Sequence, residues 1–129
     1  MIWIPLTSPS GHTQYFNADN IVMFRELLAL EAPKGAHSKI WRQTGTAQVG
    51  EKPDEILKLI REGLVKLTAA NDQPLYFNPT ACTQIGNLVS IDDKKKVAAK
   101  TMVRTANEDF AVKEDIKTVL ETLGGEAEV

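Results

Sequence analysis

Hydrophobic and polar residues alternate in short runs along most of this chain, and a period of two is typical of β-strands. In the first half, the pattern predicts strands at residues 2–7, 13–17, 21–24, 38–42 and 47–49. In our preferred interpretation, residues 25–30 continue the third strand. Phe24, Leu27 and Leu28 also have helical spacing, so a helix is the alternative interpretation of this segment. Pro5 favours the edge of a sheet, because proline has no N–H to donate to a neighbouring strand.

Two segments have the period of an amphipathic helix, and each follows the last strand of one half. The first is predicted at residues 53–62, where Pro53 suits the first turn and Asp54 and Glu55 suit the positive end of the helix dipole. The second is predicted at residues 115–123. The apolar positions expected to face the core are Ile56, Leu57, Ile60 and Leu64 for the first helix and Ile116, Val119, Leu120 and Leu123 for the second.

One pattern occurs twice. Leu6-Thr7 followed by Tyr15-Phe16-Asn17 recurs 61 residues later as Leu67-Thr68 followed by Tyr76-Phe77-Asn78. The second half is therefore predicted to repeat the strands, at residues 64–68, 75–78, 82–91, 100–104 and 110–112. The two predicted helices are 63 residues apart, which indicates a two-residue insertion between the third and fourth strands of the second half.

The predicted fold class is α+β: two tandem ββββ(β)α repeats, with antiparallel sheets each closed by one C-terminal helix, packed as an intrachain pseudo-dimer. Antiparallel pairing follows from the short turns, because parallel strands would need crossover connections. We expect a first repeat at residues 1–63, a second at 64–125 and a flexible tail at 126–129. A repeat of this size alone buries only about 60% of its unfolded surface, so the halves should gain stability from packing together.

Composition places the chain among ordinary globular proteins, with 43% hydrophobic and 25% charged residues in 129. The sequence has no run of eighteen apolar residues, and its start lacks a basic stretch followed by an apolar core. We therefore expect a cytoplasmic protein with neither a membrane span nor a signal peptide.

Residues with reactive side chains do not form a recognised catalytic or metal-binding motif. His12 and His37 fall in predicted turns without further ligands at short spacing, and Cys82 matches Ile21 of the first half, which indicates a small buried apolar residue. The glycines do not form a phosphate-binding loop, and no serine lies in a nucleophile elbow. We expect a non-enzymatic protein with no catalytic residue, no metal and no cofactor.

The duplicated aromatic pairs are the more informative feature. Adjacent residues of a strand point to opposite faces, so one ring of each pair should be buried and the other outside. The outer rings either stack nucleic-acid bases or fill the seam between the two halves. Residues assigned to the core or to an interface are Trp3, Phe16, Trp41 and Phe77.

Charge is unevenly distributed, although the net charge is only −2 and argues against a strong nucleic-acid binder. Basic residues gather in matching strand regions of the two halves, whereas residues 108–129 are acidic. Lys94, Lys95 and Lys96 are also compatible with a solvated loop. The candidate residues for single-stranded nucleic-acid binding are Tyr15, Arg25, Lys39, Arg42, Tyr76, Lys94, Lys95, Lys96, Lys100 and Arg104.

The repeated segments resemble the small FlbD-type family of bacterial flagellar operons, whose members are about one repeat long. The resemblance implies a flagellar setting and no particular reaction. The predicted topology of this chain is also similar to that of the PUR and Whirly single-stranded nucleic-acid binders, which use ββββα units. The residues that carry the FlbD-type resemblance are Leu67-Thr68, Tyr76-Phe77-Asn78-Pro79, Val112-Lys113-Glu114 and Val119-Leu120, with Val49-Gly50-Glu51 and Ile56-Leu57 in the first half.

Two functional hypotheses follow. The first is a binding or assembly protein that presents a pseudo-twofold β-surface to a macromolecular partner, either another protein or a second copy of itself. The second is a single-stranded DNA or RNA binder that uses the basic strand segments and the repeated aromatic residues.

Overall fold

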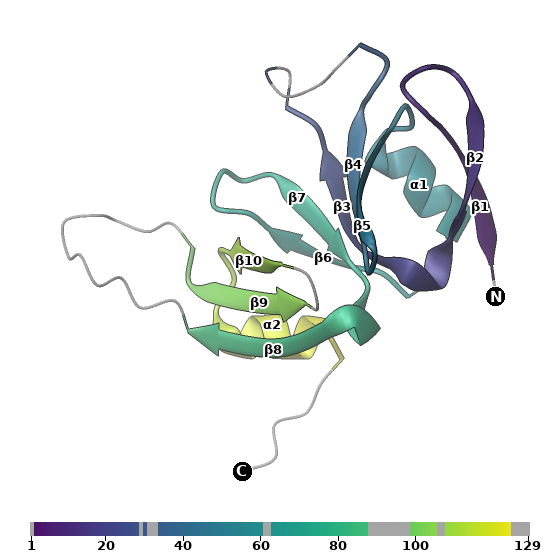
Figure 1. Cartoon of the computed structure of the whole chain (residues 1–129). Helices are drawn as coiled ribbons and strands as arrows, with labels where there is room; N and C mark the ends of the chain where they lie inside the picture. Colours follow the sequence, from purple (N-terminus) through teal and green to yellow (C-terminus); the bar gives the residue numbers. More distant parts are fainter. Residues whose placement is uncertain are drawn as a thin grey trace. The chain divides into compact units, whose positions relative to one another are not determined.

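The computed structural model describes residues 2–28, 30, 34–60, 63–87, 99–105 and 108–124. The chain divides into two compact units, Met1–Leu64 and Val65–Val129. Both units contain mainly antiparallel strands together with one α-helix each, so the predicted α+β class with antiparallel sheets is confirmed (Figure 1).

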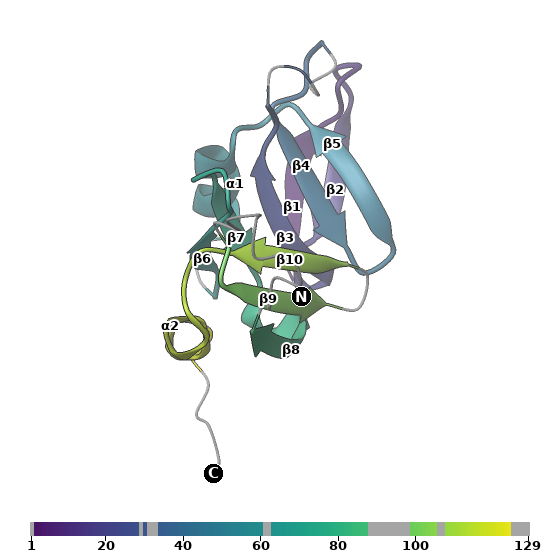
Figure 2. The ribbon, with the colours of Figure 1, turned by 90° about the vertical axis from the view of Figure 1, so that its left-hand side faces the viewer.

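In the first unit, β1 pairs antiparallel with β2, and β4 pairs with both β3 and β5. Figure 2 shows β1 and β2 as a layer behind β3, β4 and β5, with α1 along one side. The helix packs against β3. The elements are β1 Trp3–Thr7, β2 Thr13–Asn17, a 3₁₀-helix Ala18–Asn20, β3 Ile21–Glu26, β4 Ser38–Arg42, β5 Gly45–Val49 and α1 Pro53–Ile60.

In the second unit, β6 pairs antiparallel with β7, and β9 lies between β8 and β10. The helix α2 packs against β6 and β8. The elements are β6 Val65–Thr68, β7 Pro74–Phe77, a 3₁₀-helix Pro79–Ala81, β8 Cys82–Asn87, β9 Thr101–Thr105, β10 Asp109–Val112 and α2 Ile116–Thr122.

The ambiguous segment after the third strand is resolved as strand for two residues. Arg25 and Glu26 continue β3 because they pair with Lys39 and Ser38 of β4, and Leu27 and Leu28 then leave the strand without forming a helix. Pairing with a neighbouring strand thus outweighs the helical spacing. In the second half, β8 is observed to Asn87, and the rest of its predicted length, residues 88–91, lies outside the described residues.

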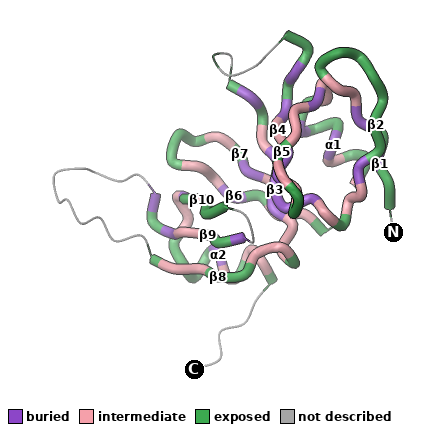
Figure 3. Tube along the Cα trace, in the orientation of Figure 1, coloured by how far each residue is buried: buried purple, intermediate pink, exposed green. Residues whose placement is uncertain are grey.

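Burial alternates along β1 but is continuous at the start of β3, where Ile21–Phe24 are all buried; Figure 3 marks the buried positions. In β1, Ile4 and Leu6 are buried, whereas Trp3 and Pro5 point outward. The largest fully buried side chains are Phe24, Phe77, Ile4, Leu6, Ile21, Met23, Ile40, Ile56, Leu67, Val22, Val49 and Val103.

The helix α2 is slightly shorter than predicted, whereas α1 begins at Pro53 as predicted and residues 61–62 of its predicted length lie outside the described residues. Fewer of the apolar residues of both helices are fully buried than expected. Ile56 of α1 and Val119 of α2 are fully buried, but Leu57 and Leu120 are half-buried. Ile116 is 38% exposed because it is the first residue of α2, so the prediction that it faces the core is wrong. Among the described helices, α1 has 8 residues and α2 has 7, and neither is long enough to cross a bilayer, which takes about 20.

A carboxylate connects the first strand of each unit to the segment before its helix. In the first unit, Glu51 accepts hydrogen bonds from the backbone N–H of Thr7 at 2.7 Å and from Thr7 Oγ1 at 2.9 Å. In the second unit, Glu114 accepts one from the backbone N–H of Thr68 at 2.9 Å. The buried hydroxyls of Ser38 and Thr101 donate to the main-chain carbonyls of Glu51 and Glu114, each at 2.6 Å. We call these two arrangements the carboxylate clasps.

Candidate binding surface on the first unit

The outer face of the β1–β2 hairpin carries Trp3, Pro5 and Tyr15, which we call the hairpin surface. Trp3 is 56% exposed and Tyr15 is 67% exposed. Pro5 lies directly opposite Tyr15, and Trp3 occupies the next outward position along β1. Diagonal neighbours on one face of a strand pair lie within reach of aromatic side chains, so the three residues form one uncharged patch.

The hairpin surface exists because the inner face of the same two strands is used for the core. Ile4, Leu6 and Phe16 point inward and are buried, which forces the intervening residues outward. The aromatic pair of β2 therefore divides as expected, with Phe16 inside and Tyr15 outside.

The second aromatic pair divides less completely. Phe77 is fully buried and contacts Phe110 edge to face, with ring centroids 5.5 Å apart, whereas Tyr76 is half-buried. Of the four residues assigned to the core or to an interface, Phe16, Trp41 and Phe77 are buried and Trp3 is exposed.

A shallow open hollow of about 270 Å³ adjoins the hairpin surface and is lined by Gln14, Tyr15, Phe16 and Arg42. The Arg42 guanidinium lies over the Phe16 ring, with Cζ 5.3 Å from the ring centroid. Arg42 is the one charged residue among those that line the hollow. The site therefore combines a cation, an amide and an exposed phenol beside an aromatic patch.

The other two cations predicted on this unit lie elsewhere. Arg25 and Lys39 are cross-strand neighbours, and both lie over the ring of Trp41, at 5.3 and 4.7 Å from its centroid. Lys39 and Trp41 share one face of β4, whereas Arg42, the next residue, points to the opposite face. The structure thus brings Tyr15 together with Arg42, and Arg25 together with Lys39, but on two separate faces.

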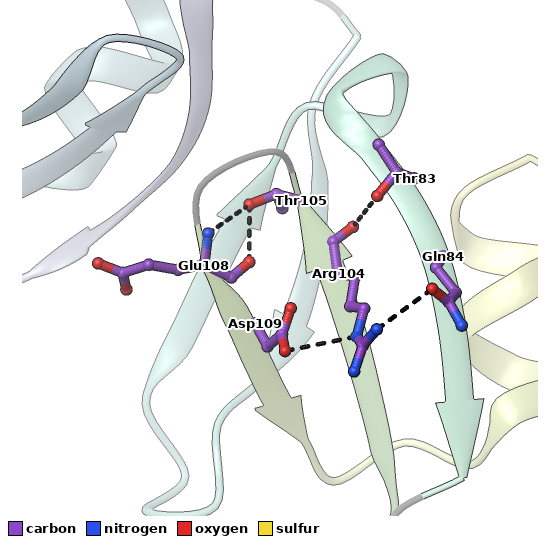
Figure 4. A network of polar contacts seen from close by, with 6 residues as sticks. All are labelled: Thr83, Gln84, Arg104, Thr105, Glu108 and Asp109. Atoms are coloured by element: carbon purple, nitrogen blue, oxygen red, sulfur yellow. Dashed lines mark hydrogen bonds and ion pairs between the residues drawn. The ribbon is translucent and has the colours of Figure 1, made fainter.

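In the second unit, Arg104 takes part in a polar network on the surface (Figure 4). Its Nε lies 3.4 Å from Asp109 Oδ2, and its terminal nitrogen lies 3.5 Å from Gln84 Oε1. The Asp109 carboxylate compensates the charge that would attract a phosphate. Lys100 is exposed just before β9, and Lys94, Lys95 and Lys96 lie outside the described residues.

Cys82 and Asp115 are the described residues whose pKa is clearly shifted. Burial raises the pKa of the Cys82 thiol to about 11, and its Sγ lies 3.6 Å from the carbonyl oxygen of Asn78, to which it donates. Such a thiol stays protonated near neutral pH and is a poor nucleophile. A backbone hydrogen bond from Thr118 lowers the pKa of Asp115, which caps α2.

Within the described parts of the chain, no three His, Cys, Asp or Glu side chains lie close enough together to hold a metal ion. His12 and His37 are both exposed. No family model, curated protein or solved structure matches this chain. The FlbD-type resemblance and the likeness to PUR and Whirly proteins therefore stay predictions.

Sequence reasoning missed Gln14 and the role of Pro5. Gln14 lines the hollow although its sequence neighbours gave no sign of a polar site. Pro5 was recognised as an edge residue, but its position opposite Tyr15 became visible only with the strand register. The signal that could have found the surface is the outward alternation of Trp3, Pro5 and Tyr15 in two strands joined by a short turn.

Proposed function

We propose that this protein is a non-enzymatic binding or assembly protein whose first unit presents the hairpin surface to a partner protein. The observation that carries the proposal is the exposure of Trp3 and Tyr15, at 56% and 67%, beside Pro5 on one regular strand pair. Tryptophan and tyrosine on rigid elements are typical anchors of protein interfaces. A cluster of such residues in water is unfavourable unless a partner covers it.

The chemistry of the surface favours a protein over a nucleic acid. The hairpin surface itself is uncharged, and Arg42 is the single cation in the hollow next to it. Binding to a phosphate backbone usually requires several cations along one path. An aromatic patch with one cation at its margin matches the apolar centre and polar rim of a protein interface.

The proposal is tested by measuring how tightly a purified partner, identified by affinity capture, binds to three variants. We expect Trp3→Ser and Tyr15→Ser each to weaken binding by more than about tenfold, because each removes an aromatic anchor. Leu30→Ser is the matched control, since Leu30 is fully exposed at 104% and belongs to the segment between β3 and β4 rather than to the hairpin. Equal affinities for all three variants would exclude the hairpin surface as the binding site.

Single-stranded nucleic acid is the second candidate, and Tyr15 beside Arg42 in the hollow favours it. A base could stack on the exposed phenol while the guanidinium contacts a phosphate. Fluorescence anisotropy with a labelled oligothymidylate separates the two functions. Binding in the range of tens of micromolar that weakens with salt supports this candidate, and no binding at low salt removes it.

We also infer that the two units are copies of one ββββ(β)α motif. Support comes from equivalent hydrogen bonds at the sequence offsets of the repeat, 61 residues for the first strands and 63 for the fourth strand and the helix. Both β3 and β8 also have a register shift after their first residue. The equivalent pairs are Thr7–Glu51 and Thr68–Glu114, Ser38–Glu51 and Thr101–Glu114, Gly50–Thr7 and Lys113–Thr68, and Asn17–Asp19 and Asn78–Thr80.

Packing of the two copies as a pseudo-dimer stays a prediction. Small-angle X-ray scattering would test it, since a single compact body of 129 residues should have a radius of gyration of about 14 Å. A clearly larger value would contradict it.

A further inference from the structure

The main-chain groups of β2 can be assigned to its two edges from the hydrogen bonds of the hairpin. The N–H of Ser8 donates to the carbonyl of His12, and the N–H of Ala18 donates to the carbonyl of Ile2. In an antiparallel pair, hydrogen-bonded and non-hydrogen-bonded pairs alternate. With the observed register, Gln14 and Phe16 therefore bond to β1, whereas Thr13, Tyr15 and Asn17 direct their N–H and C=O groups away from it.

Pro5 and Thr7 agree with this assignment independently. Pro5 has no N–H and lies opposite Tyr15, where none is needed. The N–H of Thr7, opposite Thr13, points away from β2 and donates to Glu51. The outer edge of β1 is thus engaged by its own unit, through Glu51 and through the N–H of Gly50, which donates to the Thr7 carbonyl at 2.8 Å.

The outer edge of β2 is different. Among the strands that the structure describes, β2 pairs with β1 alone. The hollow lined by Gln14, Tyr15, Phe16 and Arg42 lies beside β2, so a cation and an amide flank main-chain groups that point outward. An edge of this kind accepts an added strand, in which main-chain hydrogen bonds give affinity and an adjoining pocket gives side-chain specificity.

We propose that β2 binds an extended segment of the partner protein as an additional strand, with an acidic side chain of that segment in the hollow against Arg42. This inference rests on the proposed function and names the ligand class of the same site. Charge complementarity selects the occupant, because the hollow holds one guanidinium and one amide, which suit a single carboxylate. The exposed ring of Tyr15 then packs on the neighbouring outward residues of the added strand.

Two blocked peptides serve as probes: acetyl-Val-Thr-Glu-Val-Thr-amide and its Gln counterpart. Each is titrated into the ¹⁵N-labelled full chain while amide shifts are followed by NMR. We expect the Glu peptide to shift the amides of Thr13, Tyr15 and Asn17 most strongly and to bind on the order of tenfold more tightly than the Gln peptide, because a charged hydrogen bond to Arg42 is lost in the latter.

Paired variants test the two parts of the site. Thr13→Pro removes an outward donor and should weaken the Glu peptide severalfold, whereas Thr13→Val keeps the donor and should leave affinity unchanged. Arg42→Met keeps the contact with Phe16 but removes the charge, so it should abolish the preference for Glu over Gln, and Arg42→Lys should retain it. The ¹⁵N spectrum of each variant verifies that the first unit is folded.

Several results would overturn the inference. They are no shifts at millimolar peptide, equal affinity for both peptides, a preference that survives Arg42→Met, or tighter binding of oligothymidylate at the same amides. Concentration-dependent shifts without peptide would identify a second copy as the occupant. If the partner protein is lost from Trp3→Ser but binds Thr13→Pro and Arg42→Met normally, the proposed function stands and strand addition fails.

Discussion

Removal of the Glu51 carboxylate should destabilise the first unit, because this group joins the end of β1 to the segment before α1. Oε1 lies 2.7 Å from the Thr7 nitrogen and Oε2 lies 2.9 Å from Thr7 Oγ1. In Glu51→Ala, both donors of Thr7 lose these partners in a half-buried position. In Glu51→Gln, the amide oxygen can still accept from the Thr7 N–H, so the loss is mainly the charge.

The magnitude follows from the type of bond. A hydrogen bond to a charged group contributes about 1.5–3 kcal/mol net, and partial exposure to water places these two bonds near the lower end. We therefore expect Glu51→Ala to lower the free energy of unfolding by about 2–3 kcal/mol and Glu51→Gln by about 1 kcal/mol. The Ser38 bond to the main-chain carbonyl of Glu51 survives both changes, so the unit should still fold.

Tryptophan fluorescence during urea unfolding measures this effect selectively. Both tryptophans of the chain, Trp3 and Trp41, belong to the first unit. With an m-value of about 1–1.5 kcal/mol/M, Glu51→Ala should lower the urea midpoint by about 2 M.

The control is Glu55→Ala, which removes an exposed carboxylate from the first turn of α1 and should cost less than about 1 kcal/mol. Equal midpoints for Glu51→Ala and Glu55→Ala would refute the proposed role of the clasp. A midpoint for Glu51→Gln below that of Glu51→Ala would refute the argument from charge.

Three further predictions concern the second unit. Glu114→Ala should lower the free energy of unfolding of the second unit by about 1–2 kcal/mol, because a single carboxylate hydrogen bond to Thr68 is lost. The reaction of Cys82 with a thiol reagent at increasing urea concentration measures this loss of stability. Glu121→Ala, which removes an exposed carboxylate, is the control. Cys82 of the folded protein should react far more slowly than free cysteine at pH 8 and faster as the pH approaches its pKa of about 11; a rapid reaction at pH 8 would contradict the assigned burial. The folded-state pKa of Asp115 lies below its unfolded-state pKa. Asp115 therefore stabilises α2 fully above the unfolded-state pKa, and this stabilisation is lost as the pH falls through the folded-state pKa. Amide exchange in α2 should accelerate over that pH range in the wild type and not in Asp115→Asn.

Local patterns in the sequence were enough to predict the strands, the helices and the division of the aromatic pair in β2. These features are local, because side chains alternate along a strand whatever the strand packs against. Ile4 and Leu6 had to share one face with Trp3 on the other, and Pro53 had to begin a helix near its observed start. Hydrophobic period and turn residues were sufficient for these predictions.

Which charged residues lie together depends on long-range contacts that the sequence does not reveal. Only the register of β3 against β4 places Arg25 beside Lys39, and only tertiary packing places the Arg42 guanidinium over the Phe16 ring of β2. Arg104 was predicted as a residue that binds single-stranded nucleic acid, and pairing of β9 with β10 sets it against Asp109. Contacts across strands depend on register and on which strands are neighbours, and no local pattern contains that information.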